Sequence, residues 1–244
     1  IIFYIFVLLS FLLLSFRHDT IFIPGSEFHW SYFTGVIQGI NNNGWLLWDT
    51  PSQYGFLNII IASLFKSSSS WQSFYLFQGS LLFLVSTMIF FSLVKIMNLS
   101  FIYKILFFLI ITLALYFADP AYIGPYPYPS SSVVRFFGVY AFIIVSLYFK
   151  VFSIKQALSF SIVWIMAFLW SAESAFYASS IYIFLLIAYL IRKKSFSDFS
   201  LIYRYYLALP LFFLFISILS ISTYYRLNIG FYPDYLLFIQ HAVG

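Results

Sequence analysis

Polar side chains capable of chemistry are concentrated in two segments of an otherwise apolar chain. The first, from residue 17 to residue 66, contains acids, histidines and an amide side chain: His18, Asp19, Glu27, His29, Asp49 and Gln53. The second begins at Asp119 and ends at Arg135. Only 8% of the 244 residues are charged, so this density of polar groups argues against purely structural loops.

The surroundings of Arg135 point most directly to a ligand. Three serines, at positions 130 to 132, precede it and favour a helix start, which places Arg135 in the first helical turn. A cation there opposes the helix macrodipole by about 0.3 to 1 kcal/mol, and a bound anion removes the conflict. Backbone N–H groups, serine hydroxyls and a guanidinium together suit a phosphate. The alternative interpretation is that Arg135 extends toward lipid headgroups.

The loop ahead of Arg135 is predicted to be stiff and aromatic. Four prolines fall within residues 120–129, and Tyr122, Tyr126 and Tyr128 lie among them. Proline-rich backbone is extended and semi-rigid. Such a loop suits stacking of its rings on a sugar or a substrate chain, and the alternative is a belt of interfacial tyrosines.

The first polar segment is predicted to contain two helices. Apolar residues recur at helical spacing, which predicts an amphipathic interfacial helix: Phe28, Tyr32, Phe33, Val36, Ile37 and Ile40. Ser26 is a suitable N-cap, and Asn41–Gly44 suits the helix end. Thr50–Gln53 fits a capping box with proline at the first helical position. The run Phe56–Phe65 is too short to span a bilayer, so we expect a second interfacial or re-entrant helix there.

Each polar residue of this segment also has a structural explanation. Asp19 lies where a helix leaves the bilayer, and Glu27 is an acid in a helical first turn, where the dipole favours it. Asp49 begins a turn into a helix. Tryptophans are more often interfacial anchors than sugar platforms, and three occur here: Trp30, Trp45 and Trp48.

Composition makes this an integral membrane protein. Hydrophobic residues form 63% of the chain and charged residues only 8%. A soluble domain carries about 25% charged residues. The formal charge is +5, but the basic residues do not cluster with polar neighbours, so nucleic acid is not an expected partner. The absence of cysteine excludes disulfides, a thiol nucleophile and cysteine-ligated metals.

Hydropathy predicts an all-α polytopic protein with about seven transmembrane helices. Five charge-free stretches fit spans: Ile1–Phe16, Trp71–Val94, Ile105–Ala118, Phe136–Phe149 and Tyr205–Thr223. The stretch between Lys155 and Arg192 contains one charge, Glu173, and as a single helix it would be about 54 Å long, too long for a core of roughly 30 Å. We therefore expect it to fold back near Trp170–Ser174.

Basic residues set the expected orientation. With the first loop outside, every acidic residue except Asp198 falls outside, while Lys95, Lys150 and Lys193 fall inside. No span has an ionisable group near its middle, unlike most ion-coupled transporters. Both chain ends lie in or just past apolar runs, so we interpret residues 1–244 as one transmembrane domain of a longer protein, with a first outer loop over 17–70.

This layout resembles the GT-C superfamily of membrane glycosyltransferases. The likeness lies in a first span, a long outer loop with interfacial helices and an acid just past the membrane, and a second acid opening a later outer loop. Those acids are Asp19 or Glu27, and Asp119. The stretch Glu27–Gly55, which contains Gly44–Gly55, also looks like that of bacterial membrane proteins of this kind. The resemblance covers about the first 140 residues, and a paired acidic dipeptide common in the superfamily is absent.

The resemblance implies an inverting transfer of a sugar from a polyprenyl-phosphate donor to a glycan, lipid or protein acceptor. A carboxylate, Asp19, Glu27 or Asp119, would take the acceptor proton at the membrane surface. Arginine or a divalent cation, Mg²⁺ or Mn²⁺, would stabilise the phosphate leaving group, and no metal ligand is assigned. Substrate-binding candidates are Arg135, His29, Asp49, Gln53, Tyr54, Tyr126 and Tyr128. The implied location is a bacterial inner membrane, with the site on the periplasmic face.

Other functions remain open alternatives. A polysaccharide polymerase or ligase would share the outer-face location and rely more on arginines. A transporter of lipid-linked oligosaccharides would need a cavity lined by charges, and the uncharged span centres speak against it. A non-catalytic membrane subunit is the remaining alternative. For the transferase, we expect Asp19 and Asp119 to converge on one site.

Overall fold

The structure, a computed structural model, is helical throughout the part of the chain that it describes. It describes residues 1–17, 26–50, 52–117, 129, 132–148, 154–193, 202–237 and 240. Within these ranges no strand forms, and the one bridge, between Leu46 and Thr50, is isolated. The predicted all-α class is confirmed.

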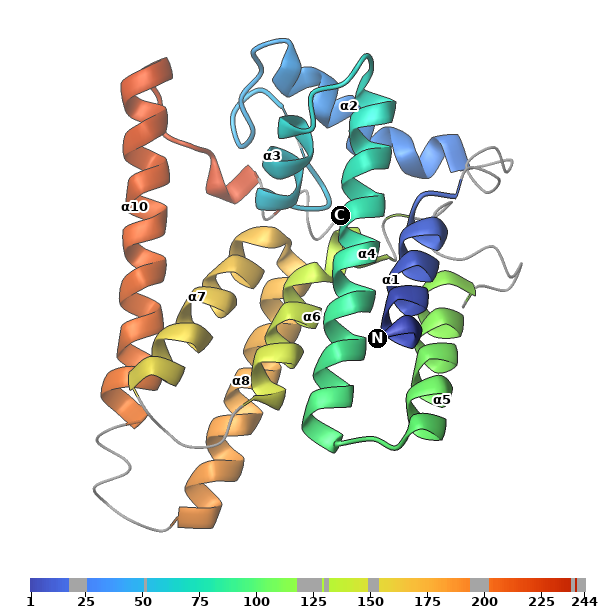
Figure 1. Cartoon of the computed structure of the whole chain (residues 1–244). Coiled ribbons are helices and arrows are strands. Elements are labelled where there is room, and N and C mark those ends of the chain that lie inside the picture. The colour runs from blue at the N-terminus through green and yellow to red at the C-terminus, as the bar shows by residue number, and fades with distance from the viewer. Residues whose placement is uncertain are drawn as a thin grey trace.

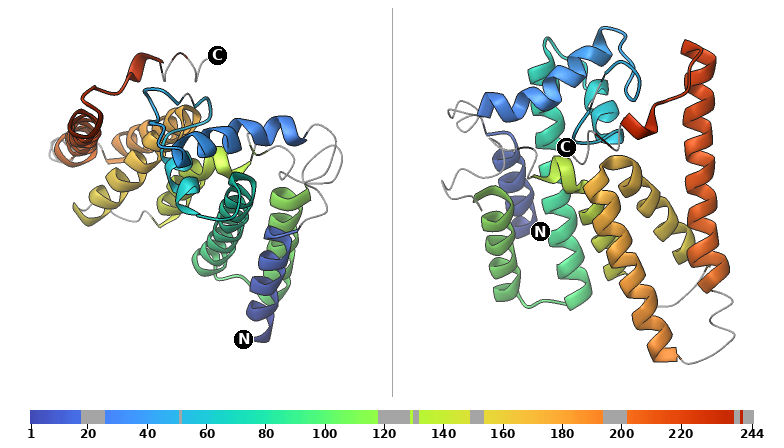
Figure 2. Two further views of the ribbon diagram at one scale, coloured as in Figure 1. Left: turned by 90° about the horizontal axis from the view of Figure 1, so that it is seen from above. Right: turned by 180° about the vertical axis from the view of Figure 1, so that it is seen from behind.

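The described residues form nine α-helices and two π-helical segments, with these bounds: α1 Ile2–Ser15, α2 Ser26–Asn41, α3 Leu57–Leu64, α4 Ser70–Met97, α5 Phe101–Thr112 continued by η1 Leu113–Phe117, α6 Val133–Leu147, α7 Ile154–Trp170, α8 Ala172–Lys193, η3 Ile202–Ala208 and α10 Leu209–Ile229. α1, α4 and α5 lie together on one side, and α6, α7 and α8 pack against one another beside α4 (Figure 1). α10 stands at the outer edge, while α2 and α3 cover one end of the molecule (Figures 1 and 2).

Two of these helices are long and apolar enough to cross a membrane. They are Ser70–Met97 and the helix over Tyr203–Ile229. In the second, only 11% of the most apolar window is buried inside the molecule, so its exposed surface is largely hydrocarbon. For the other predicted spans the apolar helical stretch is 10–17 residues long, which in α8 is the part Ala172–Ala188. Within the described residues, two candidate spans are therefore shown, and the seven-span arrangement stays a prediction.

The predicted fold-back of the long apolar stretch is confirmed. α7 ends at Trp170 and α8 begins at Ala172, with only Ser171 between them. The Ser171 hydroxyl accepts a hydrogen bond from the Ser174 N–H at 3.1 Å, which caps the new helix. Glu173 lies in the first turn of α8, where the helix dipole favours an acid.

The first polar segment folds as predicted in α2 but not ahead of α3. The amphipathic helix begins at Ser26, and its Trp30, Phe33 and Ile37 are buried. The predicted capping box at Thr50–Gln53 is wrong, because α3 begins only at Leu57 and has no side-chain cap. The Thr50 hydroxyl donates to the Asp49 carboxylate at 3.0 Å and so serves a turn instead.

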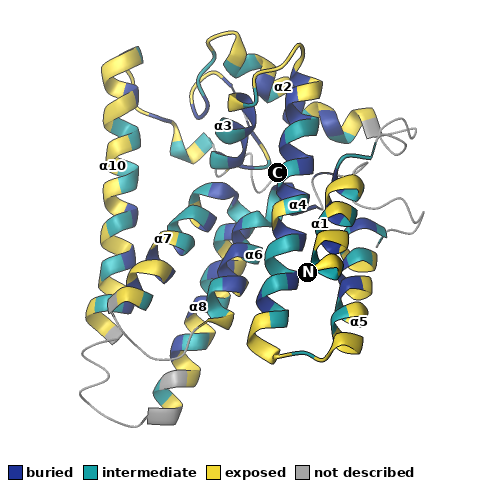
Figure 3. Ribbon diagram, viewed as in Figure 1, coloured by how far each residue is buried: buried dark blue, intermediate teal, exposed yellow. Residues whose placement is uncertain are grey.

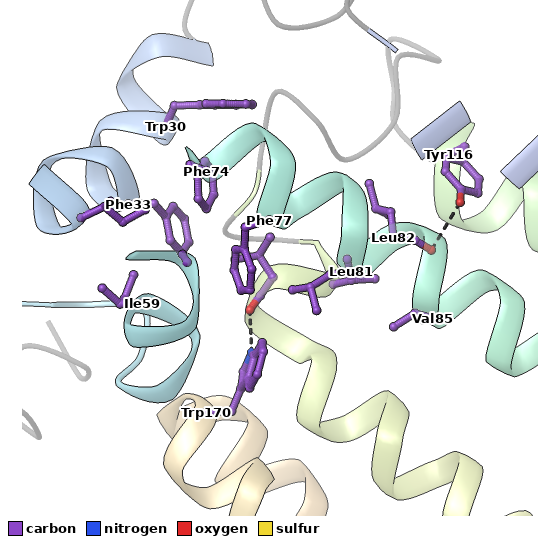
Figure 4. Packing of buried hydrophobic residues seen from close by; sticks show 14 of the residues in the cluster. Trp30, Phe33, Ile59, Phe74, Phe77, Leu81, Leu82, Val85, Tyr116 and Trp170 are labelled. Carbon is purple, nitrogen blue, oxygen red and sulfur yellow. Dashed lines mark hydrogen bonds between the residues drawn. The ribbon is translucent and has the colours of Figure 1, made fainter. Parts of the chain in front are cut away.

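The core is centred on α4. Phe74 of α4 meets Trp30 of α2 edge-on and stacks on Phe33, with ring centroids 5.1 and 4.8 Å apart (Figure 4). Deeper along α4, the Tyr116 hydroxyl in η1 is 2.7 Å from Ser15 Oγ and 2.9 Å from Ser86 Oγ. Buried residues lie mainly along α4 and α6. The first turns of α5, the lower described part of α8 and most of α10 are exposed (Figure 3).

Candidate functional site

The start of α6 is where the sequence placed Arg135, and the structure confirms that position. Ser132 caps the helix by accepting the Val134 N–H at 3.2 Å, so Arg135 lies in the first turn. The Arg135 carbonyl oxygen accepts two hydroxyls from the α7–α8 turn, Ser171 at 2.9 Å and Ser174 at 2.8 Å. The helix start is therefore fastened to the fold-back between α7 and α8.

The loop before α3 and the first turn of α3 form a second segment that is hydrogen-bonded to the start of α6 and to the end of α7. Asn58 donates to the carbonyl oxygens of Tyr54 at 2.8 Å and Val134 at 3.4 Å. Trp170 Nε1 also donates to the Val134 carbonyl, at 2.7 Å (Figure 4). The Phe56 N–H completes the arrangement by donating to the Trp170 carbonyl at 3.2 Å. Two segments distant in sequence, residues 54–58 and residues 170–174, thus meet at Val134 and Arg135 of α6.

Gly55 makes this meeting possible. Its φ of +143° lies in a region that side chains disfavour. A Cβ there would be 2.2 Å from both Asn58 Oδ1 and the Trp170 carbonyl oxygen. The loop can approach the α7–α8 turn this closely only because the residue has no side chain.

The Arg135 side chain is held by an acid and an aromatic ring. It forms an ion pair with Glu173, and its guanidinium carbon lies 4.9 Å from the centroid of the Tyr54 ring. The centroid of the Phe136 ring is 5.8 Å from the same guanidinium carbon. Arg135 and Glu173 side chains are 25% and 20% exposed, so the pair is accessible without being fully hydrated. We call Arg135, Glu173 and Tyr54 the arginine cluster.

Electrostatics keep both members of the pair charged. Burial alone favours the neutral acid, but the hydrogen bond and positive charge of Arg135 outweigh it and lower the pKa of Glu173. The hydrogen bond to Glu173 likewise raises the pKa of Arg135. One carboxylate oxygen, Glu173 Oε2, is buried and has no hydrogen-bond partner among the described residues. The pair thus uses only part of the acid's hydrogen-bonding capacity.

Sequence reasoning missed Glu173 as a site residue. An anion was expected to balance Arg135 in its helical first turn, and the structure supplies an internal one. The available signal was the position of Glu173, the single charge within a 36-residue apolar stretch and located at its fold-back. What the sequence lacked was any indication that this turn packs against the start of α6.

Tyr54 links the arginine cluster to α2. Its ring stacks on Phe33 with centroids 5.3 Å apart and meets Tyr32 edge-on at 5.5 Å. His29, a predicted substrate-binding residue, is half-buried on the same helix, with its ring 5.5 Å from that of Phe28. Glu27, a predicted catalytic residue, is exposed in the first turn of α2.

Two other predicted binding residues lie in the loop between α2 and α3. Asp49 is exposed, and its Oδ1 accepts the Trp45 N–H at 2.6 Å, so the carboxylate closes a turn. This agrees with the structural explanation of Asp49 rather than with ligand binding. Gln53 is exposed beside Tyr54.

Several predicted residues lie outside the part of the chain that the structure describes. They are Asp19, Asp119, Tyr126 and Tyr128, together with His18. The predicted convergence of Asp19 and Asp119 therefore stays a prediction. Within the described ranges, no three or more histidine and acidic side chains gather in a way that suits a metal ion.

A cavity of about 670 Å³ is lined in part by residues that closely follow Tyr54 in sequence. Phe56 and Leu57 line it from that loop and the start of α3, and Leu169 lines it from the end of α7. Residues adjacent in sequence to the arginine cluster thus form part of the cavity wall. The rest of the wall is formed by α10 between Ser217 and Tyr225.

Comparison with known proteins adds no relative to this geometry. The chain matches no protein-family model, no curated protein and no solved structure. Its function must therefore be argued from its own residues.

Proposed function

We propose that this chain is the catalytic membrane domain of a GT-C-type glycosyltransferase, or part of that domain. It transfers a sugar from a polyprenyl-phosphate donor to an acceptor at the outer surface of a bacterial inner membrane. The observation that carries the proposal is the arginine cluster. A partly exposed guanidinium in a helical first turn, backed by the Tyr54 ring, offers charge and directed N–H donors to a lipid-linked phosphate.

The proposed membrane arrangement has seven spans with α2 and α3 at the outer surface. It is supported by seven apolar helical segments, of which two have spanning length, and by the position of α2 and α3 across one end (Figure 1). Arg135 and Glu173 both lie at helix starts near that end. The site then falls at the depth where the phosphate of a lipid-linked donor resides.

Cysteine labelling tests this arrangement, since the chain contains no cysteine. Lys66→Cys, in the exposed loop before α4, is expected to react with a membrane-impermeant maleimide added outside. Lys95→Cys, at the exposed far end of α4, is expected to react only after the membrane is opened. Labelling of position 95 but not 66 from outside would reverse the topology and remove the site from the proposed face.

The proposed reaction divides the work between a base and the arginine cluster. A carboxylate, Asp19, Glu27 or Asp119, takes the proton of the acceptor hydroxyl as its oxygen attacks the anomeric carbon. The bond from that carbon to the donor phosphate breaks, and the phosphate leaves with the electron pair. Arg135 stabilises its negative charge, and Tyr54 holds the guanidinium in place through its ring face.

Donor binding by substituted full-length protein tests the role of Arg135. Arg135→Ala is expected to bind a polyprenyl phosphate at least about tenfold more weakly, since an ionic hydrogen bond contributes about 1.5 to 3 kcal/mol. Arg135→Lys keeps the charge but loses the planar fork of the guanidinium. Its affinity should therefore lie between those of Arg135→Ala and the unmodified protein. Lys66→Ala removes an exposed cation elsewhere and is the control. Equal affinity in Arg135→Ala and the unmodified protein would eliminate the proposal.

A polysaccharide polymerase or ligase is the second candidate. The observation that favours it is that the described site is centred on an arginine, Arg135, whose ion pair engages the acid Glu173. Substitution of the three candidate bases separates the two functions. If Asp19→Asn, Glu27→Gln and Asp119→Asn each leave product formation unchanged while Arg135→Ala abolishes it, the polymerase or ligase is favoured.

A further inference from the structure

The cavity beside α10 is large enough for a ligand and is walled mainly by apolar side chains. Its volume of about 670 Å³ falls within the roughly 300 to 1,000 Å³ of typical ligand sites. On the side of the helical body, Asn43, Gly44 and Trp45 line the cavity together with six apolar residues: Ile40, Leu46, Phe56, Leu57, Ile60 and Leu169. The six apolar side chains cannot form hydrogen bonds, so they suit a hydrocarbon.

Two polar side chains on the α10 wall are already engaged within the protein. The Ser217 hydroxyl donates to the Phe213 carbonyl at 2.9 Å, and the Tyr225 hydroxyl donates to the Leu46 carbonyl. A buried water typically needs two to four polar partners. The lining contains four other polar side chains, those of Asn43, Trp45, Ser220 and Tyr224, but most of the wall is apolar, which favours an apolar occupant.

The cavity is built into the fold because α10 is held at both ends. Its lower part packs against α7 (Figures 1 and 2). At the other end, Trp45 meets Tyr225 edge-on at 5.1 Å, and Trp48 stacks on Phe231 at 4.6 Å. The Asp234 N–H also donates to the Leu47 carbonyl at 2.7 Å. These attachments keep the C-terminal half of α10 from closing onto α3.

The medium around α10 identifies the occupant. This helix is one of the two long enough to cross a membrane, and its outward side chains are exposed: Phe215 is 63% and Leu219 53% accessible. In a bilayer these side chains contact hydrocarbon, so the material next to the cavity is lipid chain. We propose that one acyl chain of a bilayer phospholipid occupies the cavity and fills the space between α10 and α3.

This lipid is structural and separate from the donor of the proposed reaction. The residues of the arginine cluster, Arg135, Glu173 and Tyr54, are not among those that line the cavity. A chain in the cavity fills space that would otherwise leave its apolar wall without contacts. The polyprenyl chain of a donor is the competing occupant, and the experiment distinguishes the two.

Native mass spectrometry of the intact protein tests the proposal. The protein is released from nanodiscs of palmitoyl-oleoyl phosphatidylethanolamine and phosphatidylglycerol that also contain a polyprenyl phosphate, and one phospholipid is expected to stay bound. Ser217→Phe projects a ring into the cavity and displaces the equivalent of about two methylene groups, so retention should fall about tenfold. Leu219→Phe, two residues away on the exposed face, is the matched control and should retain lipid normally.

Three results would overturn the proposal. They are no retained phospholipid in the unmodified protein, equal retention in Ser217→Phe and the unmodified protein, and retention of a polyprenyl phosphate in place of phospholipid. None of them depends on sugar transfer, so failure here leaves the proposed function untouched. Conversely, loss of donor binding in Arg135→Ala with normal phospholipid retention keeps both proposals.

Photo-crosslinking provides a second readout that needs no substitution. A phosphatidylcholine carrying a diazirine near the end of one acyl chain is reconstituted with the unmodified protein and irradiated. Adducts are expected on cavity residues of both walls, such as Ile60 in α3 and Ile221 in α10. Adducts confined to outward residues such as Phe215 and Leu219 would show annular lipid only and would contradict an occupied cavity.

Discussion

The arginine cluster and the edge formed by α10 are held together in different ways. At the start of α6, the carbonyl oxygens of Val134 and Arg135 together accept four side-chain donors from other segments, and Gly55 permits a close backbone approach. At the edge, α10 is attached by aromatic contacts and a few hydrogen bonds, with a cavity between the attachments.

The two kinds of attachment have different consequences. A carbonyl that accepts directional hydrogen bonds allows little displacement, since these bonds weaken steeply with angle. Ring contacts tolerate shifts because dispersion is non-directional and shared among many atoms. We therefore expect the arginine cluster to be a fixed site, as a phosphate-binding group must be, and the α10 edge to adapt to what fills it.

The largest effect is expected from adding a side chain at Gly55. Gly55→Ala combines a φ of +143° with Cβ contacts of 2.2 Å, so it should destabilise the fold by about 3 kcal/mol or more. Thermal unfolding in detergent measures the change. Gly35→Ala is the control, because a Cβ there meets nothing within 4 Å. Similar melting temperatures for the two variants would mean that the loop is not held as described.

The next largest effect is expected from breaking the ion pair. Glu173→Gln and Arg135→Met should each destabilise the protein by about 1 to 3 kcal/mol, because each leaves a partly buried charge without its partner. The double variant should cost less than the sum of the two. A double-mutant cycle measured by denaturant or thermal unfolding gives the coupling, and strict additivity would show that the pair does not interact.

The ion pair should also depend on pH in one direction. The pKa of Glu173 is lower in the folded protein than its ordinary value of 4.5, so the folded state binds fewer protons than the unfolded state. Its contribution is thus complete above about pH 4.5 and is lost as the pH falls through the folded pKa. The stability difference between unmodified protein and Glu173→Gln should shrink on acidification. A difference that grows below that pH would contradict the sign.

A smaller effect is expected from removing one of the hydrogen-bond donors to the Val134 carbonyl. Trp170→Phe loses the indole N–H that donates to Val134 at 2.7 Å but keeps an aromatic ring beside Phe137. A cost of about 1 kcal/mol is expected. Trp164→Phe removes a similar donor, bonded to Ser179 at 2.9 Å, away from the cluster and is the comparison. The affinity for a polyprenyl phosphate should fall for Trp170→Phe and not for Trp164→Phe.

The smallest effect on stability is expected at the α10 edge. Trp48 is 42% exposed and stacks on Phe231, so Trp48→Ala should cost about 0.5 to 1.5 kcal/mol. Its effect on dynamics should be larger than its effect on stability, because it releases one attachment of the segment after α10. Hydrogen exchange of residues 231–237 should rise while that of α6 stays unchanged. A uniform rise in both would remove the distinction between the two regions.

The sequence by itself was sufficient for the features that depend on neighbouring residues. The serines before α6 and the apolar period of α2 act within one or two helical turns, and both predictions are confirmed. The fold-back at Trp170–Ser174 followed from helix length alone and is also confirmed. The capping box at Thr50–Gln53 failed because a local pattern competes with tertiary contacts, here the hydrogen bonds from the Phe56 N–H to the Trp170 carbonyl and from Asn58 to the Val134 carbonyl.

Only the tertiary structure decided which residues share the site. Arg135 and Glu173 are 38 residues apart, and Tyr54 lies 81 positions before Arg135 in a different loop. Their meeting depends on how α6 packs against α7 and α8, and Gly138 permits this packing because a Cβ there would lie 2.6 Å from the Ala167 Cα. Helix caps and hydropathy are short-range signals, whereas packing is set by the shapes of whole helix surfaces. The partner of Arg135 could therefore be found only in the folded chain.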